Sequence, residues 1–311
     1  MPSQSIATVQ YINAAEKEIR LAFIAAMNSI RSNDIDALIE QLIIDGREES
    51  IADLADSIPA AIFAALTLIV VNTGERNAEL ITEHLDLTVP FVVTALIADS
   101  FVTEKDKLER YFILTQRDAI IEAKKYIISK PHTMAQQVNA YKTALGLNSQ
   151  QTQAVMNYRS HLERRSSQAL KRQLRDKRFD SSVRRSINGT RVLTPAQIDR
   201  MVLRYTERSL IARAKMIAIT ETTRAIHEGL DESFNQAISD GFLIPSGITH
   251  EWVIRHDGKA RHSHNGMDKQ KRTHGNPFIS DNGVELRYPG DSRAPANETA
   301  NCRCRVKTSL A

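Results

Sequence analysis

Apolar residues recur at every third or fourth position through the first half of the chain, which is the spacing of a helix with one buried face. The pattern predicts helices over residues 8–33, 35–44, 75–85 and 104–123, and another from about residue 50. Asn33 and Asp34 provide the first break, and Gly46 ends the second helix. We expect Pro59 at a kink or in the first turn of the apolar helix that follows.

The helical period returns after Pro131, which marks a linker or hinge. A helix over residues 150–174 is expected, with Asn148 or Ser149 as its cap. Thr194 then caps a long helix that reaches about residue 229, and a separate helix is expected over residues 231–239.

The period changes to that of a strand near the C-terminal end. Polar and apolar residues alternate over residues 249–254, and Asn282-Gly283 lies between two short apolar segments, which predicts a hairpin. Loops fill most of the rest, so we expect a small α+β unit with little core of its own. The expected fold class is mainly α, with a helical region over residues 1–146, a basic helical region over 147–248 and a small α+β, loop-rich C-terminal domain over 249–311.

The apolar run over residues 58–71 is shorter than the ~20 residues that cross a bilayer, so we expect a buried helix and no membrane partner. No secretory signal precedes it. Cys302 and Cys304 are the chain's two cysteines, and their C-x-C spacing would close a strained disulfide ring. Both features favour a protein made in a reducing compartment.

Charge is distributed unevenly, although the formal net charge is only +4. Residues 1–158 carry 13 Lys and Arg against 20 Asp and Glu, whereas residues 159–215 carry 16 against 5. The basic stretch predicts sequence-nonspecific contact with DNA phosphates, because few aromatic side chains accompany it for base stacking. The candidate DNA-binding residues are Arg159, Arg164, Arg165, Arg172, Arg175, Lys177 and Arg178. Alternatively, these side chains dock on an acidic protein surface or pair with the acidic N-terminal half.

Two histidines and the two cysteines form a candidate metal site. Two imidazoles and two thiolates match the ligand types of tetrahedral zinc, and a loop-rich unit of this size gains stability from a metal. The candidate ligands are His262, His264, Cys302 and Cys304. Their H-x-H and C-x-C spacings are tighter than those of most structural sites, so the alternative is buried thiols beside surface histidines.

A second candidate set carries acid–base chemistry. Histidine titrates near neutral pH, and carboxylates orient it or hold a divalent ion. His256, Asp257, His264 and Asp268 could therefore serve a metal-dependent hydrolase or nuclease. The alternative is a structural hydrogen-bond network, because the spacing singles out no nucleophile or phosphate cradle.

The order of several motifs resembles the phage head-morphogenesis proteins, the minor head proteins of the phage Mu F-like type. The resemblance covers roughly residues 150–311 and includes the segments 174–180, 217–225 and 288–291. The family-motif residues are Glu221, Arg224, Trp252, Asp257, Arg261, His264, Asp268, Asn301, Cys302, Arg303 and Cys304.

This resemblance implies a structural minor capsid protein rather than an enzyme. Members are carried in few copies inside the procapsid or virion, associate with the portal, and act in procapsid assembly, DNA packaging or delivery. The implied partners are the portal protein, the scaffold or major capsid protein, and DNA. Assembly in the host cytoplasm agrees with the cysteine content, and zinc is the one cofactor that the residues suggest.

Overall fold

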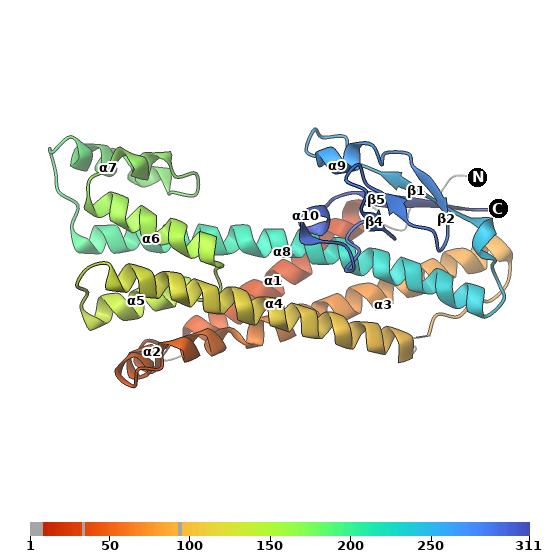
Figure 1. Ribbon diagram of the computed structural model, residues 1–311, viewed down its shortest axis with the longest axis horizontal. Helices are drawn as coiled ribbons and strands as arrows, with labels where there is room; N and C mark the ends of the chain where they lie inside the picture. Colours follow the sequence, from red (N-terminus) through yellow and green to blue (C-terminus); the bar gives the residue numbers. More distant parts are fainter. Residues whose placement is uncertain (1–8, 33–34, 93–94) are drawn as a thin grey trace. The chain divides into compact units, whose positions relative to one another are not determined.

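The computed structural model describes residues 9–32, 35–92 and 95–311, and it is mainly α-helical with a small region of strands near the C-terminal end (Figure 1). The α-helices are α1 (Val9–Ser32), α2 (Ile35–Ile44), α3 (Ser57–Leu85), α4 (Ala95–Ile128), α5 (Met134–Ala144), α6 (Ser149–Glu163), α7 (Asp180–Ile187), α8 (Pro195–Ser239), α9 (His262–Asn265) and α10 (Ala296–Thr299). The strands are β1 (Ile248–Val253), β2 (Lys271–Thr273), β3 (Phe278–Ile279), β4 (Glu285–Leu286) and β5 (Arg305–Leu310). This confirms the fold class expected from the sequence.

The chain divides into two compact units, and each unit gathers segments that are distant in sequence. Unit 1 comprises Met1–Ala22, Ile62–Asp106 and Lys215–Ala311, and unit 2 comprises Phe23–Ala61 and Lys107–Ala214. The domain boundaries expected near residues 146 and 248 follow changes of composition along the sequence. The two units are instead defined by contacts in space, so each contains several separate segments of the sequence.

The first helices lie close to their predicted positions. α1 and α2 match the two stretches read from the apolar pattern, and Gly46 follows α2 in the left-handed conformation with φ 66°. The third stretch begins differently, because a 3-10 helix, η1 (Glu48–Ala55), precedes α3. Pro59 lies in the first turn of α3, where its missing N–H costs no helical hydrogen bond.

The predicted helix over residues 150–174 is wrong in its length. α6 is capped by Asn148 as expected, through a capping box with Gln151, but it ends at Glu163. Arg165 adopts a left-handed conformation with φ 54°, and the Ser166 N–H donates to the His161 carbonyl across the turn. That bond closes the helix terminus without a glycine, and the 3-10 helix η2 (Ser167–Lys171) follows.

The predicted break near residue 229 is also wrong, because α8 is one continuous helix of 45 residues. Gly229 lies inside it rather than at its end. A Cβ atom at this position would approach the carbonyl oxygen of Val70 on α3 to 2.5 Å. The glycine therefore permits close approach of two helices within unit 1, which a sequence pattern does not distinguish from a helix stop.

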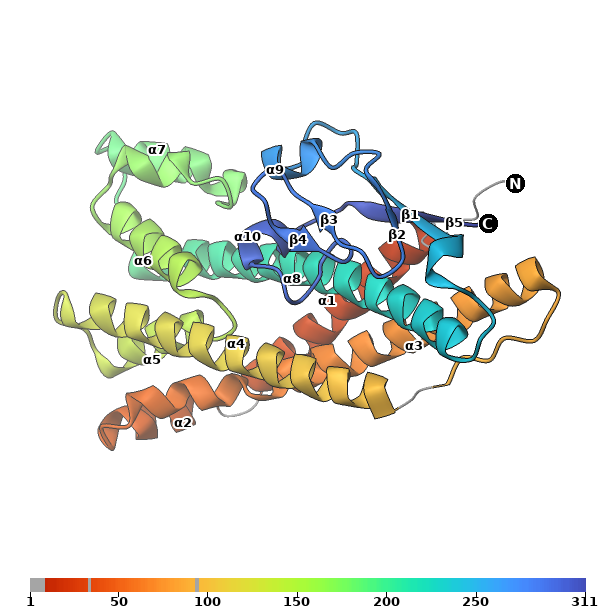
Figure 2. The same cartoon turned by 45° about the vertical axis from the view of Figure 1, so that its right-hand side comes forward.

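The C-terminal region contains two small antiparallel sheets, which Figure 2 shows together. One has the strand order β2-β1-β5, with Trp252 opposite Val306. The other is the expected hairpin, in which Phe278 pairs with Leu286 and Gly283 occupies the turn with φ 75°. The strand and the hairpin turn predicted from the sequence are both present.

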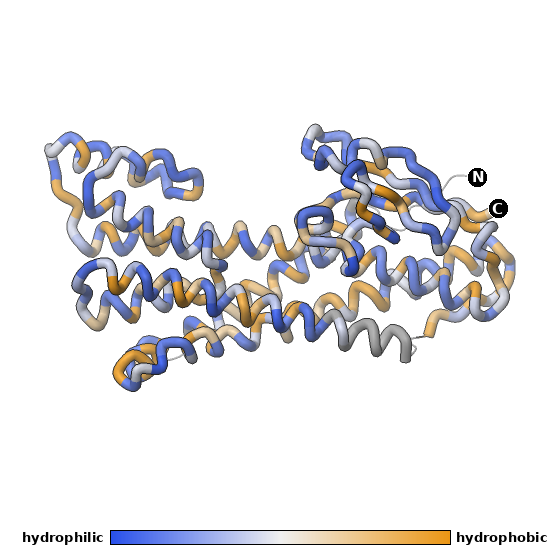
Figure 3. The backbone as a smooth tube through the Cα atoms, viewed as in Figure 1, coloured by the Kyte–Doolittle hydropathy of each residue, from blue (hydrophilic) through white to orange (hydrophobic). Residues whose placement is uncertain are grey.

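This region has more core than expected. One hydrophobic core cluster of buried residues consists of Trp252, Met267, Phe278, Leu286, Cys302 and Cys304. Trp252 contacts the Phe278 ring edge-on, with centroids 5.2 Å apart. The prediction of little core was wrong because these six residues are separated by loops, so no window of the sequence appears apolar. Figure 3 shows hydrophobic and hydrophilic positions mixed over the C-terminal region, with no long hydrophobic run.

One described helical stretch, Glu48–Leu85, is long and apolar enough to cross a membrane when judged by length and composition alone. Of its most apolar window, 39% is buried within the protein. Ile58 and Ile62 are fully buried on it, whereas Leu68 is 65% exposed. The expected helix is thus present, but only part of its apolar surface is buried.

Candidate metal centre

His264 lies on the single turn of α9, where it is 1% exposed, and the preceding Ser263 is also buried. His262 is exposed and belongs to no metal-ligand group. On a helical turn, residues two apart point to different sides. The expected set of four is therefore reduced to three, and His262 does not join His264, Cys302 and Cys304.

The three remaining side chains form a cluster that could hold a metal ion. The donor atoms of His264, Cys302 and Cys304 all lie within 4.8 Å of one another, and all three residues are buried. His264 Nδ1 lies 3.7 Å from Cys302 Sγ and 3.5 Å from Cys304 Sγ. Tetrahedral coordination with ordinary Zn–S and Zn–N bonds places such N and S atoms about 3.6 Å apart. The two N···S distances therefore fit a tetrahedral ion.

A carboxylate lies behind the imidazole. His264 Nε2 is 3.0 Å from Oε2 of Glu298, which is itself 1% exposed. Ser263 Oγ donates to Oε2 and Asn282 Nδ2 donates to Oε1, each over 2.8 Å. With the carboxylate beside Nε2, the other ring nitrogen, Nδ1, is the one that faces the two sulfur atoms.

The pKa values of the acidic groups around the cluster follow from these contacts. Burial raises the pKa of Glu298, but the hydrogen bonds from Asn282 and Ser263 and the charge on His264 outweigh it and lower the pKa overall. The hydrogen bond with Cys304 lowers the pKa of the Cys302 thiol, and His264 lowers it further. Cys302 is therefore the first of the pair to become the thiolate that a soft metal binds.

The loop that carries the cysteines is fixed by hydrogen bonds from α8. Thr223 Oγ1 donates to the Cys302 carbonyl over 2.9 Å, and the Asn301 N–H donates to Thr220 Oγ1 over 2.8 Å. Arg261 donates to the carbonyls of Glu298 and Ala300, just before the loop. Asn301 adopts φ 58°, a left-handed conformation that asparagine tolerates.

Further motif residues tie the preceding segment to the same part of α8. Arg224 and Glu221 form the expected i,i+3 ion pair at 2.9 Å. A Cβ at Gly290, which has φ 84°, would lie 3.0 Å from the Arg224 backbone nitrogen. Tyr288 donates its hydroxyl to Glu228 one turn further along α8. The motif residues on α8 and at the C-terminal end thus meet in one region of unit 1.

The candidate acid–base set does not share one location. His256 is exposed and lies 3.7 Å from Asp268, whose other oxygen accepts the Ile254 N–H. Asp257 pairs with Arg255 at 3.2 Å in an exposed loop. His264 instead faces the thiols. The four residues therefore lie at three separate places: His256 beside Asp268 on the surface, Asp257 in an exposed loop, and His264 in the buried cluster.

The candidate DNA-binding residues, all in unit 2, fall into two groups. Arg175 makes two hydrogen bonds of 2.9 Å to Asp180, Arg178 pairs with Asp176 at 2.6 Å, and Arg159 pairs with Asp199. Arg172 donates to His161 over 3.2 Å. The residues that are exposed and make no ion pair within the described chain are Arg164, Arg165 and Lys177.

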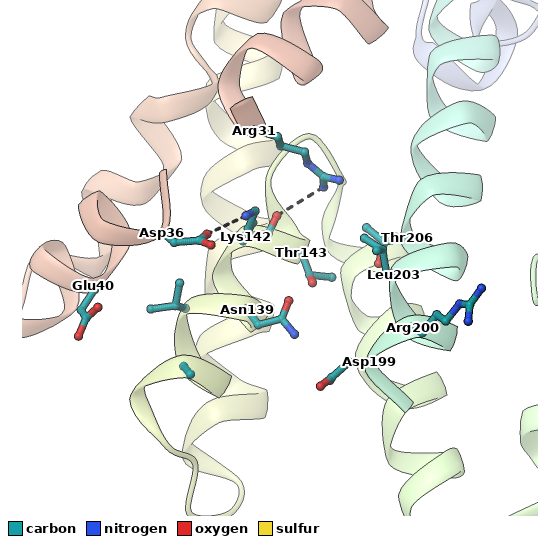
Figure 4. A pocket seen from close by; sticks show the side chains of 12 residues that line it. Arg31, Asp36, Glu40, Asn139, Lys142, Thr143, Asp199, Arg200, Leu203 and Thr206 are labelled. Carbon is teal, nitrogen blue, oxygen red and sulfur yellow. Dashed lines mark hydrogen bonds and ion pairs between the residues drawn. The ribbon is translucent and has the colours of Figure 1, made fainter. Parts of the chain in front are cut away.

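Unit 2 also contains a pocket of about 520 Å³ that no sequence motif indicated (Figure 4). Its wall carries both signs of charge, and several of these groups are already paired. Lys142 contacts Asp36 at 2.8 Å, and Arg31 donates to the Lys142 carbonyl over 3.4 Å. Because the charges offset one another, the pocket favours no particular ligand charge.

Sequence reasoning missed Glu298, Ser263 and Asn282. They lie 34, 1 and 18 residues from His264, counted along the chain, and no periodic pattern links them. Ser263 was visible only as the residue between two histidines. The usable signal was chemical, because a metal-binding histidine generally needs a partner for its second nitrogen.

No protein-family model matches the chain, and neither the curated proteins nor the solved structures include a match to it.

A second buried polar network connects α8 with the three-stranded sheet. His227 on α8 places Nδ1 2.7 Å from the Thr223 carbonyl and accepts the Val306 N–H of β5 at Nε2 over 3.3 Å. His250 on β1 contacts Thr308 over 2.9 Å and His274 over 3.0 Å. Burial lowers the pKa of His227 and of His250 to about 4 in each case.

These shifts predict acid sensitivity. Since the folded pKa values of His227 and His250 lie below the unfolded value of 6.5, the unfolded chain binds more protons below that pH. The contribution of each histidine should be constant above pH 6.5 and fall by about 1.4 kcal/mol per pH unit between pH 6.5 and 4. Asp231, whose pKa burial raises to about 6, opposes this fall below pH 6. Urea denaturation at a series of pH values measures this slope.

The change His250→Gln should remove the contribution of His250 to that slope and leave the contribution of His227. His84→Gln, at an exposed position, is the matched control and should leave the slope unchanged. If the free energy of unfolding depended on pH equally in the two variants, the acid sensitivity could not be assigned to His250.

Proposed function

We propose that the protein is a structural minor head protein of a tailed phage, associated with the portal and acting in procapsid assembly, DNA packaging or delivery. The observation that carries the proposal is the meeting of the α8 motif with the Asn301–Cys304 loop. Thr220 and Thr223 bind a loop about 80 residues away in sequence through its main-chain atoms. Two of the segments that carry the family resemblance, 217–225 and 301–304, are thus joined by hydrogen bonds.

The contacts that the motif residues make support a structural role. Arg261 donates to carbonyl oxygens, and Arg224 pairs with Glu221. Trp252 is fully buried in the core. Side chains committed to main-chain carbonyls and to the core stabilise a fold, whereas catalytic groups must remain accessible to a substrate. We therefore favour an assembly protein over the hydrolase alternative.

Zinc is the metal that we assign to the cluster. Two thiolates and one imidazole are ligands that zinc prefers, and the Glu298 carboxylate supplies the outer partner that orients the histidine. The donors come from α9 and from the loop before β5, so one ion would cross-link two segments 38 residues apart. Such a cross-link would stabilise a region built mainly of loops.

We expect about one zinc per chain after purification without chelators, measured by elemental analysis. The double variant Cys302→Ser with Cys304→Ser should lose the zinc and melt at a lower temperature. His262→Ser, two residues from His264 but exposed, should retain both the metal and the melting temperature. Equal metal content in the two variants would exclude the cluster as the site.

We further propose that the exposed basic side chains of unit 2 contact packaged DNA without sequence preference. Arg164, Arg165 and Lys177 are the candidates, since Arg159, Arg175 and Arg178 are engaged by carboxylates. Phosphate contacts of this kind weaken steeply as salt displaces the protein.

Changing Arg164, Arg165 and Lys177 together to Gln should lower the salt concentration at which the protein leaves a DNA column, and it should reduce the salt slope by about three phosphate contacts. A variant with Arg20, Arg47 and Arg117 changed to Gln loses the same charge at exposed positions elsewhere and serves as the control. Identical elution of the two variants would place the DNA contact on another surface. Arg175→Gln should mainly destabilise the fold, because it leaves the buried Asp180 with only the longer contact to Arg184 at 3.9 Å.

The assembly role is tested by purifying procapsids and isolated portal protein from cells that produce this chain. The proposal requires the chain in few copies per procapsid, and its recovery with the portal protein after detergent and high salt. Absence from procapsids, or recovery only with free DNA, would overturn the portal assignment. Incubation of the zinc-loaded protein with plasmid and Mg²⁺ should leave the plasmid intact.

A further inference from the structure

A pocket of about 450 Å³ lies beside the thiol–imidazole cluster, and all of its lining residues belong to unit 1. His264, Cys302 and Cys304 form part of its wall. Five basic residues line the rest together with one carboxylate, Asp257; they are Lys215, Arg255, Lys259, Arg261 and Arg303. A pocket of this size accommodates a ligand as large as a mononucleotide.

Two of the five cations are already offset by carboxylates. Arg255 pairs with Asp257 at 3.2 Å, and Arg303 pairs with Glu16 at 3.4 Å. Arg261 is bound only to carbonyl oxygens and keeps its full charge. Lys215 and Lys259 are exposed and form no ion pair with any part of the chain that the structure describes. The pocket therefore carries an excess of positive charge.

The cluster on the pocket wall has three protein donors, and tetrahedral coordination requires four. Glu298 does not supply the fourth, because its oxygens are engaged by His264, Ser263 and Asn282 on the far side of the imidazole. The remaining position is therefore available to a ligand from the pocket. Zn²⁺ with two thiolates and a neutral imidazole has no net charge, so the surrounding cations decide which ligand charge is favoured.

We propose that this pocket binds a phosphate-bearing anion, with one phosphate oxygen at the fourth position of the metal and the others facing Lys215, Lys259 and Arg261. The proposal rests on the zinc assignment made above. Phosphate fits because it offers several oxygens around one centre, to which the two ammonium groups can donate together. The Arg261 guanidinium, which is held by two carbonyl oxygens, adds its positive charge beside them. The phosphate can belong to a free nucleotide or to the 5′ end of a DNA strand.

The test uses the full-length protein loaded with Co²⁺, whose visible absorption bands report changes in coordination. Inorganic phosphate and AMP are titrated in, with adenosine as the control that lacks phosphate. Phosphate and AMP should shift the bands and adenosine should not. Equal responses to AMP and adenosine, or anion binding without any band shift, would overturn the proposal.

Variants locate the site. Lys215→Gln with Lys259→Gln should weaken AMP binding about fivefold to tenfold, because two exposed charge contacts are lost. Lys17→Gln with Lys307→Gln removes the same charge from exposed positions of unit 1 that lie off the pocket and should bind as the unaltered protein does. Equal weakening in both pairs would show only a general charge effect and would overturn the pocket assignment.

To find whether the phosphate belongs to a nucleotide or to a DNA end, we would measure the binding of a short single-stranded oligonucleotide with and without a 5′ phosphate. Tighter binding of the phosphorylated form than of AMP identifies a DNA end, and the reverse order identifies a free nucleotide. Metal uptake is measured before any anion is added. Failure to take up Co²⁺ or Zn²⁺ overturns the zinc assignment and this proposal together, whereas uptake without an anion response overturns this proposal alone.

Discussion

The attachment of the Asn301–Cys304 loop to α8 is the interaction on which the C-terminal part of the molecule depends. Thr220 and Thr223 fix the main chain of the loop. One turn further along α8, His227 accepts the N–H of Val306 in β5. These contacts determine where both cysteines point and where the last strand begins. A threonine hydroxyl serves here because it can bind a carbonyl or an N–H while its methyl group stays in apolar surroundings.

Several buried polar groups beside this attachment contact one another. His264 is bounded by two thiols on one side and a carboxylate on the other, and that carboxylate accepts two further hydrogen bonds. Burial of a carboxylate without such partners would cost several kcal/mol. The arrangement therefore tolerates little substitution at Glu298, Ser263 or Asn282, although none of these residues has an obvious signature in the sequence. Their role is to hold the imidazole in one orientation.

Local pattern was sufficient for much of the fold and for part of the site. The apolar period located α1 and α2, and the Asn282-Gly283 turn located the β3–β4 hairpin, because these features depend on residues close in sequence. The end of α6 and the continuity of α8 through Gly229 depend on a left-handed Arg165 and on a neighbouring helix, which local propensity does not contain. Likewise, the types of side chain were enough to select His264, Cys302 and Cys304 as candidate ligands. The sequence could not show that His262 points away from them or that Glu298 lies beside His264, because both facts depend on the fold.

The position of Cys304 has a consequence for the sheet. β5 begins at the next residue, with Arg305 opposite Val253 on β1. A strand that slips by one residue turns every side chain to the other face, and such a slip would also withdraw the Cys304 sulfur from His264. A metal ion bound at this cluster would therefore be coupled to the alignment of the final strand, because it would disfavour misaligned pairings of β5.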